Sequence, residues 1–281
     1  MSLSAIRILF FSLISVSFQW SDLAPPKLAS AEGFSVITYN VGNVNEAHPT
    51  PQQVLDVTAD SLPDVFLLQE VWALEYADAF AEIFSKAAGK PVYRQYFQVG
   101  GGVAVLSTSP LTDTGLIPGT EVYGGGYALC ELNGKRVLLC SMHLPFIPKE
   151  RNENGEVSMG IGALSGTVLK EWTMESPRSR LMEQLLPWIA EYPAEAKIIA
   201  GDFNTIPFSR LQTVMHDGFS DSLYMKRDYL SSSYRKISIP FGTRADYIFS
   251  SEEVTAAESY VISESKGDHY PVYAFYRWVL P

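Results

Sequence analysis

Residues 197–204 read Lys-Ile-Ile-Ala-Gly-Asp-Phe-Asn, an apolar run rich in β-branched residues that stops abruptly at Asp202 and Asn204. A continuous apolar run of this length is typical of a strand that is buried on both faces. Such a strand carries its last side chains to the rim of a sheet, so this one presents a carboxylate and an amide there. The stretch therefore predicts a central buried strand with a functional rim at its end.

Four other apolar runs meet polar side chains in the same way. They are 34–39 before Asn40, 65–68 before Gln69-Glu70, 137–142 before His143, and the last run, which follows Asp268-His269. Taken singly, a polar residue after a strand is typical of a turn or a helix cap. Five such ends in one chain indicate metal and phosphate chemistry.

Amphipathic segments between these strands predict three helices, over 51–62, over 73–88, and from Ser176-Pro177 onward. Thr50 before Pro51 is typical of a helix start, Gly89 of a helix end, and Pro187 predicts a kink or an early stop. The side chains expected to face the core are Val54, Leu55 and Thr58, then Leu74, Ala77, Ala81 and Phe84, then Leu181, Leu185, Trp188 and Ile189.

Length and pattern predict a single α/β domain. The 281 residues are 47% hydrophobic, enough for one large core. Short strands in hairpins alternate with amphipathic helices, which favours two mixed sheets that face each other with helices outside.

The first residues have the features of a secretory signal peptide. Arg7 precedes an apolar run of about eleven residues, too short to span a bilayer, and Ala29-Ser30-Ala31 has the small-x-small form that signal peptidases cut. We therefore expect a signal peptide over 1–31, a mature domain over 32–281, and a secreted or periplasmic protein. An uncleaved membrane anchor is the alternative.

With 31 acidic and 21 basic residues, the surface repels polyanions at a distance.

The two cysteines flank Asn133-Gly134, a strong hairpin signal. A two-residue turn pairs Leu132 with Lys135, and period-two alternation then directs Cys130 and Cys140 to opposite faces. We expect two buried free cysteines, or a disulfide only if the hairpin is irregular.

Residues 144–172 form a segment far longer than ordinary connections. Because it leaves directly from His143, we expect a substrate-facing insert; a surface loop without function is the alternative. Its apolar side chains could contact lipid. They are Phe146, Ile147, Met159, Ile161, Leu164 and Leu169.

The residue types assemble into a metal-assisted hydrolytic site. Asn40, Glu70 and Asp268 supply the hard oxygen ligands that suit Mg²⁺ or Mn²⁺, and the chain lacks the Cys/His set that zinc prefers. His269, oriented by Asp246, has the form of a general base that activates water.

The polar residues at the other strand ends are suited to contacts with the phosphoryl group. His143 and Asn204 could hydrogen-bond the phosphoryl oxygens, as in-line displacement requires. Asp202 would position the nucleophile or protonate the leaving oxygen. We expect Asp202 and His269 on a rim that solvent reaches.

Six motifs in order resemble those of the endonuclease/exonuclease/phosphatase superfamily, over about residues 34–276. They are Tyr39-Asn40-Val41, Leu68-Gln69-Glu70-Val71-Trp72, Ser141-Met142-His143-Leu144, Gly201-Asp202-Phe203-Asn204, Asp246-Tyr247-Ile248-Phe249 and Gly267-Asp268-His269. The resemblance implies a four-layer α/β sandwich and a Mg²⁺-dependent phosphodiesterase or phosphatase with the residue roles given above. One departure is Gly267, which stands where that family usually has serine.

The substrate is less constrained, because one fold hosts many functions. The Leu68–Trp72 motif and residues 101–107 look most similar to the neutral sphingomyelinase branch, which implies a phospholipid headgroup substrate, with peripheral membrane contact through 144–172 and no obligate protein partner. A secreted DNase-like nuclease acting on a nucleic-acid phosphodiester is the alternative. Independently of the substrate, Trp72 could simply be a core residue. A binding module without catalysis is the third alternative. Such a module would not need to keep all of the candidate site residues together.

Overall fold

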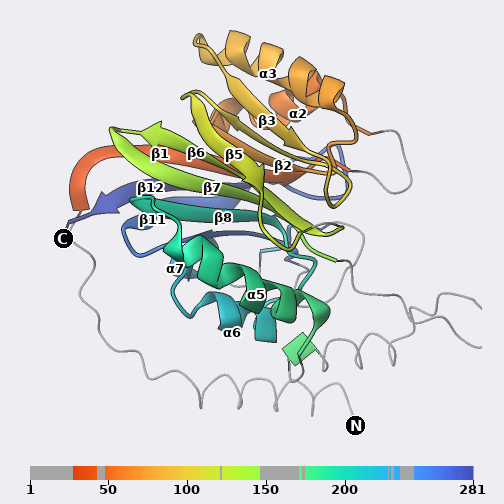
Figure 1. Ribbon diagram of the computed structural model, residues 1–281. Coiled ribbons are helices and arrows are strands. Elements are labelled where there is room, and N and C mark those ends of the chain that lie inside the picture. Colours follow the sequence, from red (N-terminus) through yellow and green to blue (C-terminus); the bar gives the residue numbers. More distant parts are fainter. Residues whose placement is uncertain are drawn as a thin grey trace, which may run out of the picture.

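The computed structural model describes residues 28–42, 48–120, 122–145, 171–172, 175–226, 228, 231–234 and 244–280. Two six-stranded mixed sheets face each other, and helices cover the outer face of each (Figure 1). This arrangement is the four-layer α/β sandwich that the sequence predicts.

The strand order places a parallel pair near the middle of each sheet. The first sheet runs β11 (Val254–Val261), β12 (Val272–Val279), β1 (Leu28–Asn40), β2 (Val65–Gln69), β4 (Val103–Ser107) and β3 (Tyr93–Phe97). The second runs β5 (Leu111–Leu116), β6 (Gly124–Leu132), β7 (Lys135–His143), β8 (Ala196–Asp202), β10 (Asp246–Ser250) and β9 (Ser220–Asp221). β1 is parallel to β2 and β7 to β8. The carboxyl ends of these strands therefore meet at common edges.

Period-two alternation sorts each central strand between two cores. In β2, Val65 and Leu67 enter the core between the sheets, whereas Phe66 and Leu68 pack under the helices of the first sheet. β7 and β8 divide in the same manner between the inter-sheet core and a third cluster under α5 (Pro177–Glu191) and α6 (Arg210–Met215). Burial on both faces explains why these strands read as continuous apolar runs.

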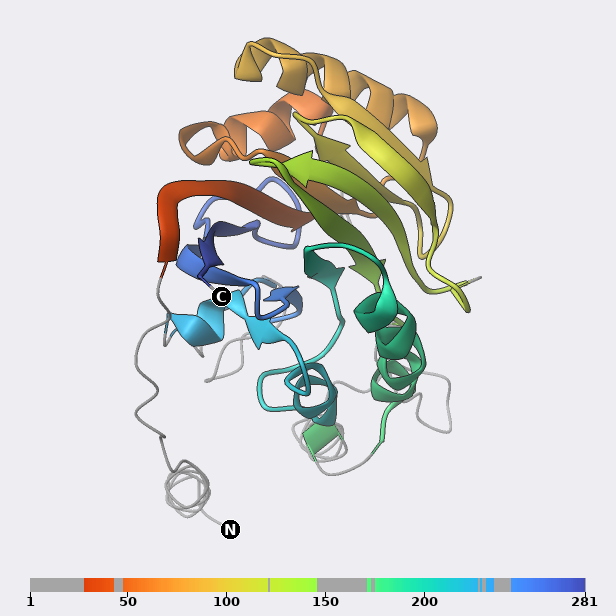
Figure 2. The same cartoon turned by 60° about the vertical axis from the view of Figure 1, so that its left-hand side comes forward.

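The helices lie on the outside of the sandwich. They are α2 (Pro51–Val57), the 3₁₀ turn η1 (Ala59–Ser61), α3 (Leu74–Ala88), α5 (Pro177–Glu191), α6 (Arg210–Met215) and α7 (Ser222–Met225). A view turned by 60° shows α2 and α3 on one side of the paired sheets and α5 and α6 on the other (Figure 2).

The predicted caps are present, but three details differ. Thr50 and Ser176 form capping boxes and Gly89 ends α3 in the left-handed region at φ +66°. The first helix stops at Val57 and continues only as η1, and Leu74 is exposed because it opens the first turn of α3. The third helix does not stop at Pro187, which lies on the exposed face, but continues to Glu191.

In the third helix, Leu185 and Ile189 are buried as predicted. Leu181 and Trp188 are only half-buried and pack at the margin of the same core.

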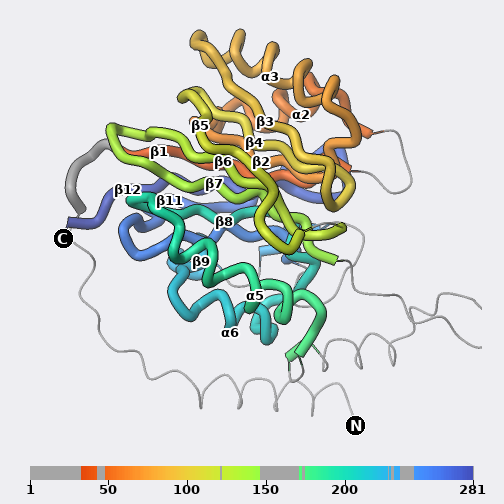
Figure 3. Tube along the Cα trace, viewed as in Figure 1, coloured from red at the N-terminus to blue at the C-terminus, as the bar shows by residue number. Residues whose placement is uncertain are grey.

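The β6–β7 hairpin, whose two strands run side by side in Figure 3, has the predicted two-residue turn. Leu132 pairs with Lys135, and Cys130 pairs with Val137. Cys130 enters the inter-sheet core and Cys140 the core under α5, so the thiols lie on opposite faces. Both cysteines are free and buried, as predicted. Burial raises the pKa of the Cys130 thiol to about 12.

Two predicted segments lie largely outside the described residues. The signal peptide lies outside up to residue 27, while β1 already begins at Leu28 and runs through Ala31. The apolar side chains expected to meet lipid, all within 146–170, lie outside as well. Among the helices that can be described, none has the length and apolar character needed to cross a membrane.

Candidate active site

Strand topology brings the predicted site residues to one edge of the sandwich. Asn40 ends β1 beside Gln69, because β1 and β2 are parallel. His143 ends β7 directly beside Asp202 at the end of β8, and Asp246 opens the antiparallel strand β10 opposite Asp202. Residues distant in sequence therefore become neighbours through strand register alone.

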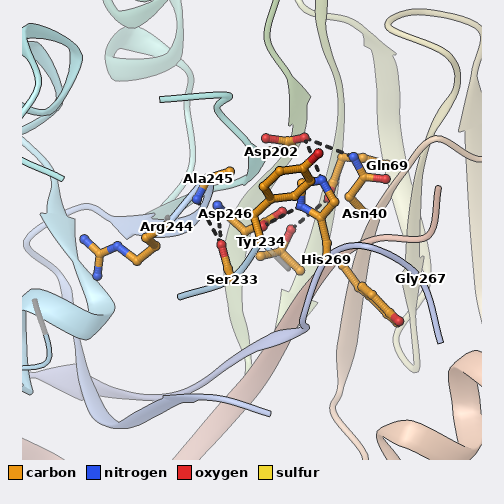
Figure 4. Close-up of polar contacts among 12 residues, drawn as sticks. Asn40, Gln69, Asp202, Ser233, Tyr234, Arg244, Ala245, Asp246, Gly267 and His269 are labelled. Carbon is orange, nitrogen blue, oxygen red and sulfur yellow. Dashed lines mark hydrogen bonds and ion pairs between the residues drawn. The ribbon is translucent and has the colours of Figure 1, made fainter. Parts of the chain in front are cut away.

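The Oδ2 atom of Asp202 lies at the centre of the site (Figure 4). Asn40 Nδ2 donates a hydrogen bond to it at 3.0 Å, and the Nε2 atoms of His143 and His269 lie 3.6 and 3.7 Å away. The expected solvent-reached rim is wrong for Asp202 and His269, which are 1% and 6% exposed. They are covered because residues 233–234 pair with Tyr270 and His269 above the strand ends.

His269 and Asp246 form the expected pair. His269 Nδ1 lies 2.8 Å from Asp246 Oδ2, and both side chains are buried. Burial lowers the pKa of His269, but the charges of Asp246 and Asp202 outweigh burial and raise it. Burial raises the pKa of Asp246, and the nearby imidazole opposes that rise. The arrangement leaves Nε2 of His269 directed at Asp202.

His143 is oriented by the loop that follows β3. Its Nδ1 contacts the carbonyl oxygen of Gly100, whose own N–H donates to Val122 at 2.9 Å. This contact turns Nε2 toward Asp202 and toward Glu70 Oε1, which is 3.9 Å away. The two histidines thus approach Asp202 from different elements.

Glu70 and Asn40 are adjacent, as predicted for a shared ligand set. Asn40 Nδ2 donates to Glu70 Oε1 at 3.1 Å, and Asn40 Oδ1 accepts from the Gly42 N–H at 2.9 Å. Glu70 has the left-handed φ of +55°, and a Cβ on Gly42 would lie 1.8 Å from Glu70 Oε2. Asn40 therefore bridges two carboxylates through its nitrogen, and its amide must turn over to offer oxygen to a metal ion.

Asp268 belongs to the same acidic cluster. It is 3% exposed, and its charge acts on both His269 and Tyr234. Four carboxylates, those of Glu70, Asp202, Asp246 and Asp268, thus gather around two imidazoles.

This excess of negative charge, made of hard oxygen donors, fits a divalent cation such as Mg²⁺ or Mn²⁺. Within the described residues, the close-set group of candidate ligands is Asp202, Asp246 and His269, whose ligand atoms lie within 4.8 Å of one another. That group differs from the predicted ligand set of Asn40, Glu70 and Asp268. The two sets of residues belong to the same acidic cluster, but they do not surround the same point.

Asn204 lies at the site edge with its amide partly occupied. Its Nδ2 donates to the Leu144 carbonyl at 2.9 Å, and its backbone N–H donates to Asp202 Oδ1 at 2.8 Å. Its φ of +47° shows that the chain turns sharply at this point. The predicted contact with phosphate would use the second amide hydrogen.

Sequence reasoning missed Ser233 and Tyr234. The Ser233 hydroxyl accepts the backbone N–H groups of Ala245 and Asp246 at 3.0 and 2.9 Å, and Tyr234 pairs with His269 (Figure 4). They lie in a serine-rich stretch without helical or strand periodicity, so the sequence held no signal for their position.

A family model matches most of the chain: residues 37–269 match that of the endonuclease/exonuclease/phosphatase family. The chain belongs to this family. No curated protein matches the chain. Membership confirms the predicted enzyme class, a metal-dependent phosphoric diester hydrolase. The predicted membership is therefore confirmed at the level of the superfamily.

Solved structures share the fold at low identity. An endonuclease/exonuclease/phosphatase from Beutenbergia cavernae has a TM-score of 0.59 at 16% identity, over 88% of this chain and 72% of the other. The catalytic domain of human Nocturnin, with bound sulfate, has a TM-score of 0.60 at 14% identity, over 88% and 95%. A 3′ phosphatase, NExo, from Neisseria, bound to product DNA hairpin, has a TM-score of 0.56 at 16% identity, over 87% and 100%.

The structure explains why this family member has Gly267 in place of serine. A Cβ on Gly267 would lie 2.7 Å from the backbone oxygen of Gly42, so the two loops approach too closely for a side chain. A serine hydroxyl is nevertheless present two residues earlier. Ser265 Oγ accepts the Gly267 N–H at 3.1 Å and lies 3.0 Å from the Tyr39 hydroxyl.

Proposed function

We propose that this chain is a secreted, Mg²⁺-dependent phosphodiesterase of the sphingomyelinase type, which hydrolyses its substrate by in-line attack of water. One observation supports the hydrolytic part above all others. The Nε2 atoms of His143 and His269 both face Asp202 Oδ2, and Asp246 holds His269 from behind.

The proposed reaction needs one proton acceptor and a held phosphoryl group. His269 Nε2 takes a proton from water as the water oxygen bonds to phosphorus and the bond to the leaving oxygen breaks. Asp246, hydrogen-bonded to Nδ1, stabilises the imidazolium that forms. Asp202 positions the water or protonates the leaving oxygen, while His143 and Asn204 hold the phosphoryl oxygens.

We assign the metal site to Asn40, Glu70 and Asp268. Mg²⁺ or Mn²⁺ bound there would supply positive charge for the phosphoryl oxygens and offset the carboxylates. Those carboxylates raise the pKa of His269 above its ordinary value and so favour the imidazolium in the metal-free site. His269 must be neutral before it can accept a proton. The reaction therefore depends on a cation whose positive charge offsets the carboxylates.

A phospholipid headgroup is the preferred substrate. The acidic balance of the chain disfavours polyanions, and its motif 68–72 resembles the sphingomyelinase branch. Trp72 in this motif is 54% exposed and donates from Nε1 to His48 Nδ1 at 3.2 Å, so it is not a core residue. An exposed tryptophan two residues from Glu70 suits an interface that is apolar on one side and wet on the other.

A nucleic-acid phosphodiester is the second candidate. It is favoured by the similar structures, which include a Neisseria 3′ phosphatase bound to product DNA hairpin and a humanized D. rerio TDP2. This alternative predicts DNA degradation that weakens steeply as salt rises, because phosphate contacts are screened.

Product analysis separates the two substrates. The purified protein is offered sphingomyelin, phosphatidylcholine, plasmid DNA and an inositol polyphosphate with Mg²⁺, and His269→Ala serves as the blank. Phosphocholine released from sphingomyelin by the wild type alone supports the lipid proposal. Cleaved DNA without phosphocholine would transfer the proposal to the nuclease.

The proposed location has its own test. Expression with the full N-terminus, followed by mass spectrometry of the exported fraction, should give a chain that begins near Glu32. Regular pairing of β1 with β12 runs from Gly33 to Thr38, so removal of residues 1–31 leaves that ladder intact. A full-length chain retained in the membrane fraction would instead support the uncleaved anchor.

A further inference from the structure

Tyr234 is held at the site by an anchored segment. The neighbouring Ser233 is fully buried, and its hydroxyl accepts two backbone N–H groups at the start of β10. Its carbonyl oxygen accepts the Tyr270 N–H at 2.7 Å, on the other side of the segment. Tyr234 is therefore fixed between β10 and the loop that carries His269.

The ring of Tyr234 packs against His269, the proposed base. The two ring centroids of Tyr234 and His269 are 4.8 Å apart at an interplanar angle of 58°, and the two backbones pair as an antiparallel bridge. Figure 4 shows the ring beside His269, with its hydroxyl directed toward the side of the site where Asp202 and Asn40 lie. The ring thus shields His269 and aims its polar end inward.

The hydroxyl of Tyr234 is subject to the negative charges of the site. Burial raises its pKa, and the charges of Asp268, Asp202 and Glu70 raise it further, to about 12. The group is consequently a neutral O–H donor at any ordinary pH. Within the part of the chain that the structure describes, no hydrogen bond occupies this hydroxyl, so it can donate to a bound substrate.

We infer that Tyr234 is a further catalytic residue, whose hydroxyl donates a hydrogen bond to a non-bridging phosphoryl oxygen of the substrate. The inference rests on the proposed function. Four carboxylates repel a phosphodiester anion, and a neutral donor aimed into the cluster stabilises the phosphoryl oxygens without a further cation. Because this hydrogen bond is made to an oxygen that stays on phosphorus, it stabilises the reaction of any diester, whichever alcohol is the leaving group.

Tyr234→Phe tests the hydroxyl while it keeps the ring on His269. Tyr273→Phe is the matched control, because Tyr273 is also half-buried and has a raised pKa but stacks on Tyr260, within the first sheet. We expect kcat to fall on the order of 100-fold in Tyr234→Phe, with the Mg²⁺ concentration for half-maximal rate and the melting temperature unchanged. Tyr273→Phe should keep the wild-type kcat.

Two diesters distinguish the contact from leaving-group protonation. Bis(4-nitrophenyl) phosphate needs no proton on its leaving oxygen, whereas a diester with an alkyl leaving group does. Equal losses of kcat in Tyr234→Phe on both support the inference. A loss confined to the alkyl diester, an unchanged kcat, or a shifted Mg²⁺ requirement would each overturn it.

Binding of inorganic phosphate separates this inference from the proposed function. Calorimetry on the Mg²⁺-loaded full chain should show a dissociation constant about 10-fold weaker in Tyr234→Phe than in wild type. That result upholds Tyr234 even if no diester is hydrolysed, in which case only the proposed function fails. Equal phosphate affinity in the two proteins, or none in wild type, overturns the role of Tyr234.

Discussion

At the scale of single residues, the side chains of the site are arranged around the carboxylate of Asp202. Its Oδ2 atom is approached by one amide and two imidazoles within 3.7 Å, while Oδ1 accepts the Asn204 backbone N–H at 2.8 Å. Four carboxylates in one cluster, three of them buried, repel each other, so the site is expected to cost stability in the absence of a cation.

Asp202→Asn should therefore separate activity from stability. We expect turnover to fall at least 100-fold, because the anion that positions the water is lost. The melting temperature in the presence of a chelator should stay the same or rise, because one repelling charge is gone. Circular dichroism melts beside an activity assay measure both, and a clearly lower melting temperature would show that Asp202 is mainly structural.

Glu70→Ala tests the metal assignment. The Mg²⁺ concentration that gives the half-maximal rate should rise by about 10-fold or more, since a hard oxygen ligand is removed. Glu75→Ala is a suitable control, because Glu75 lies exposed in the first turn of α3. A metal titration that coincides with wild type would remove Glu70 from the metal site.

At the scale of elements, the close approach of two loops sets the position of His269. A Cβ on Gly267 would collide with the Gly42 backbone, and Gly42 in turn leaves no room for a side chain beside Glu70. The last loop and the end of β1 are thereby held against each other. Small changes at either glycine should alter the position of His269, the proposed base.

Gly267→Ser should lower activity, even though it restores the residue that the family usually has. Its Cβ would meet the Gly42 carbonyl oxygen at 2.7 Å, and backbone atoms cannot rotate away. We expect kcat to drop about 10-fold or more through displacement of Asp268 and His269. Ser265→Ala, measured alongside, removes a hydroxyl without adding bulk; a Gly267→Ser variant as active as wild type would contradict the steric account.

The elements also show what a sequence can predict. Strand runs and hairpin register followed from periodicity, which is why the opposite faces of Cys130 and Cys140 were predictable. The ends of parallel strands meet by topology, so Asn40, His143 and Asp202 could be grouped in advance. Ser233 and Tyr234 could not, because tertiary hydrogen bonds alone place their segment, and burial of the site came from that same segment.

At the scale of the whole molecule, the site lies where the edges of the two sheets meet. Asn40 and Glu70 come from the first sheet, whereas His143, Asp202 and Asp246 come from the second. The hydrogen bond from Asn40 to Asp202 crosses between them. A cation in this cluster would therefore join the two halves of the sandwich.

Mg²⁺ should accordingly stabilise the folded chain. An ion that binds only the native state raises the unfolding free energy by about 2.7 kcal/mol at one hundred times its dissociation constant. We expect the melting temperature to rise with Mg²⁺ in wild type and much less in Glu70→Ala. Differential scanning calorimetry with and without a chelator measures this, and identical melts would argue against a native metal site.

The central claim is hydrolysis of a phosphodiester by water that His269 activates, in a metal-dependent manner. The most direct measurement is mass spectrometry of the products formed in ¹⁸O-water, for wild type and His269→Ala, with Mg²⁺ and with a chelator. The claim predicts one ¹⁸O atom in the phosphate-bearing product of Mg²⁺-loaded wild type, and no product in the other three reactions. Label in the alcohol product, or labelled phosphate from His269→Ala, would contradict it.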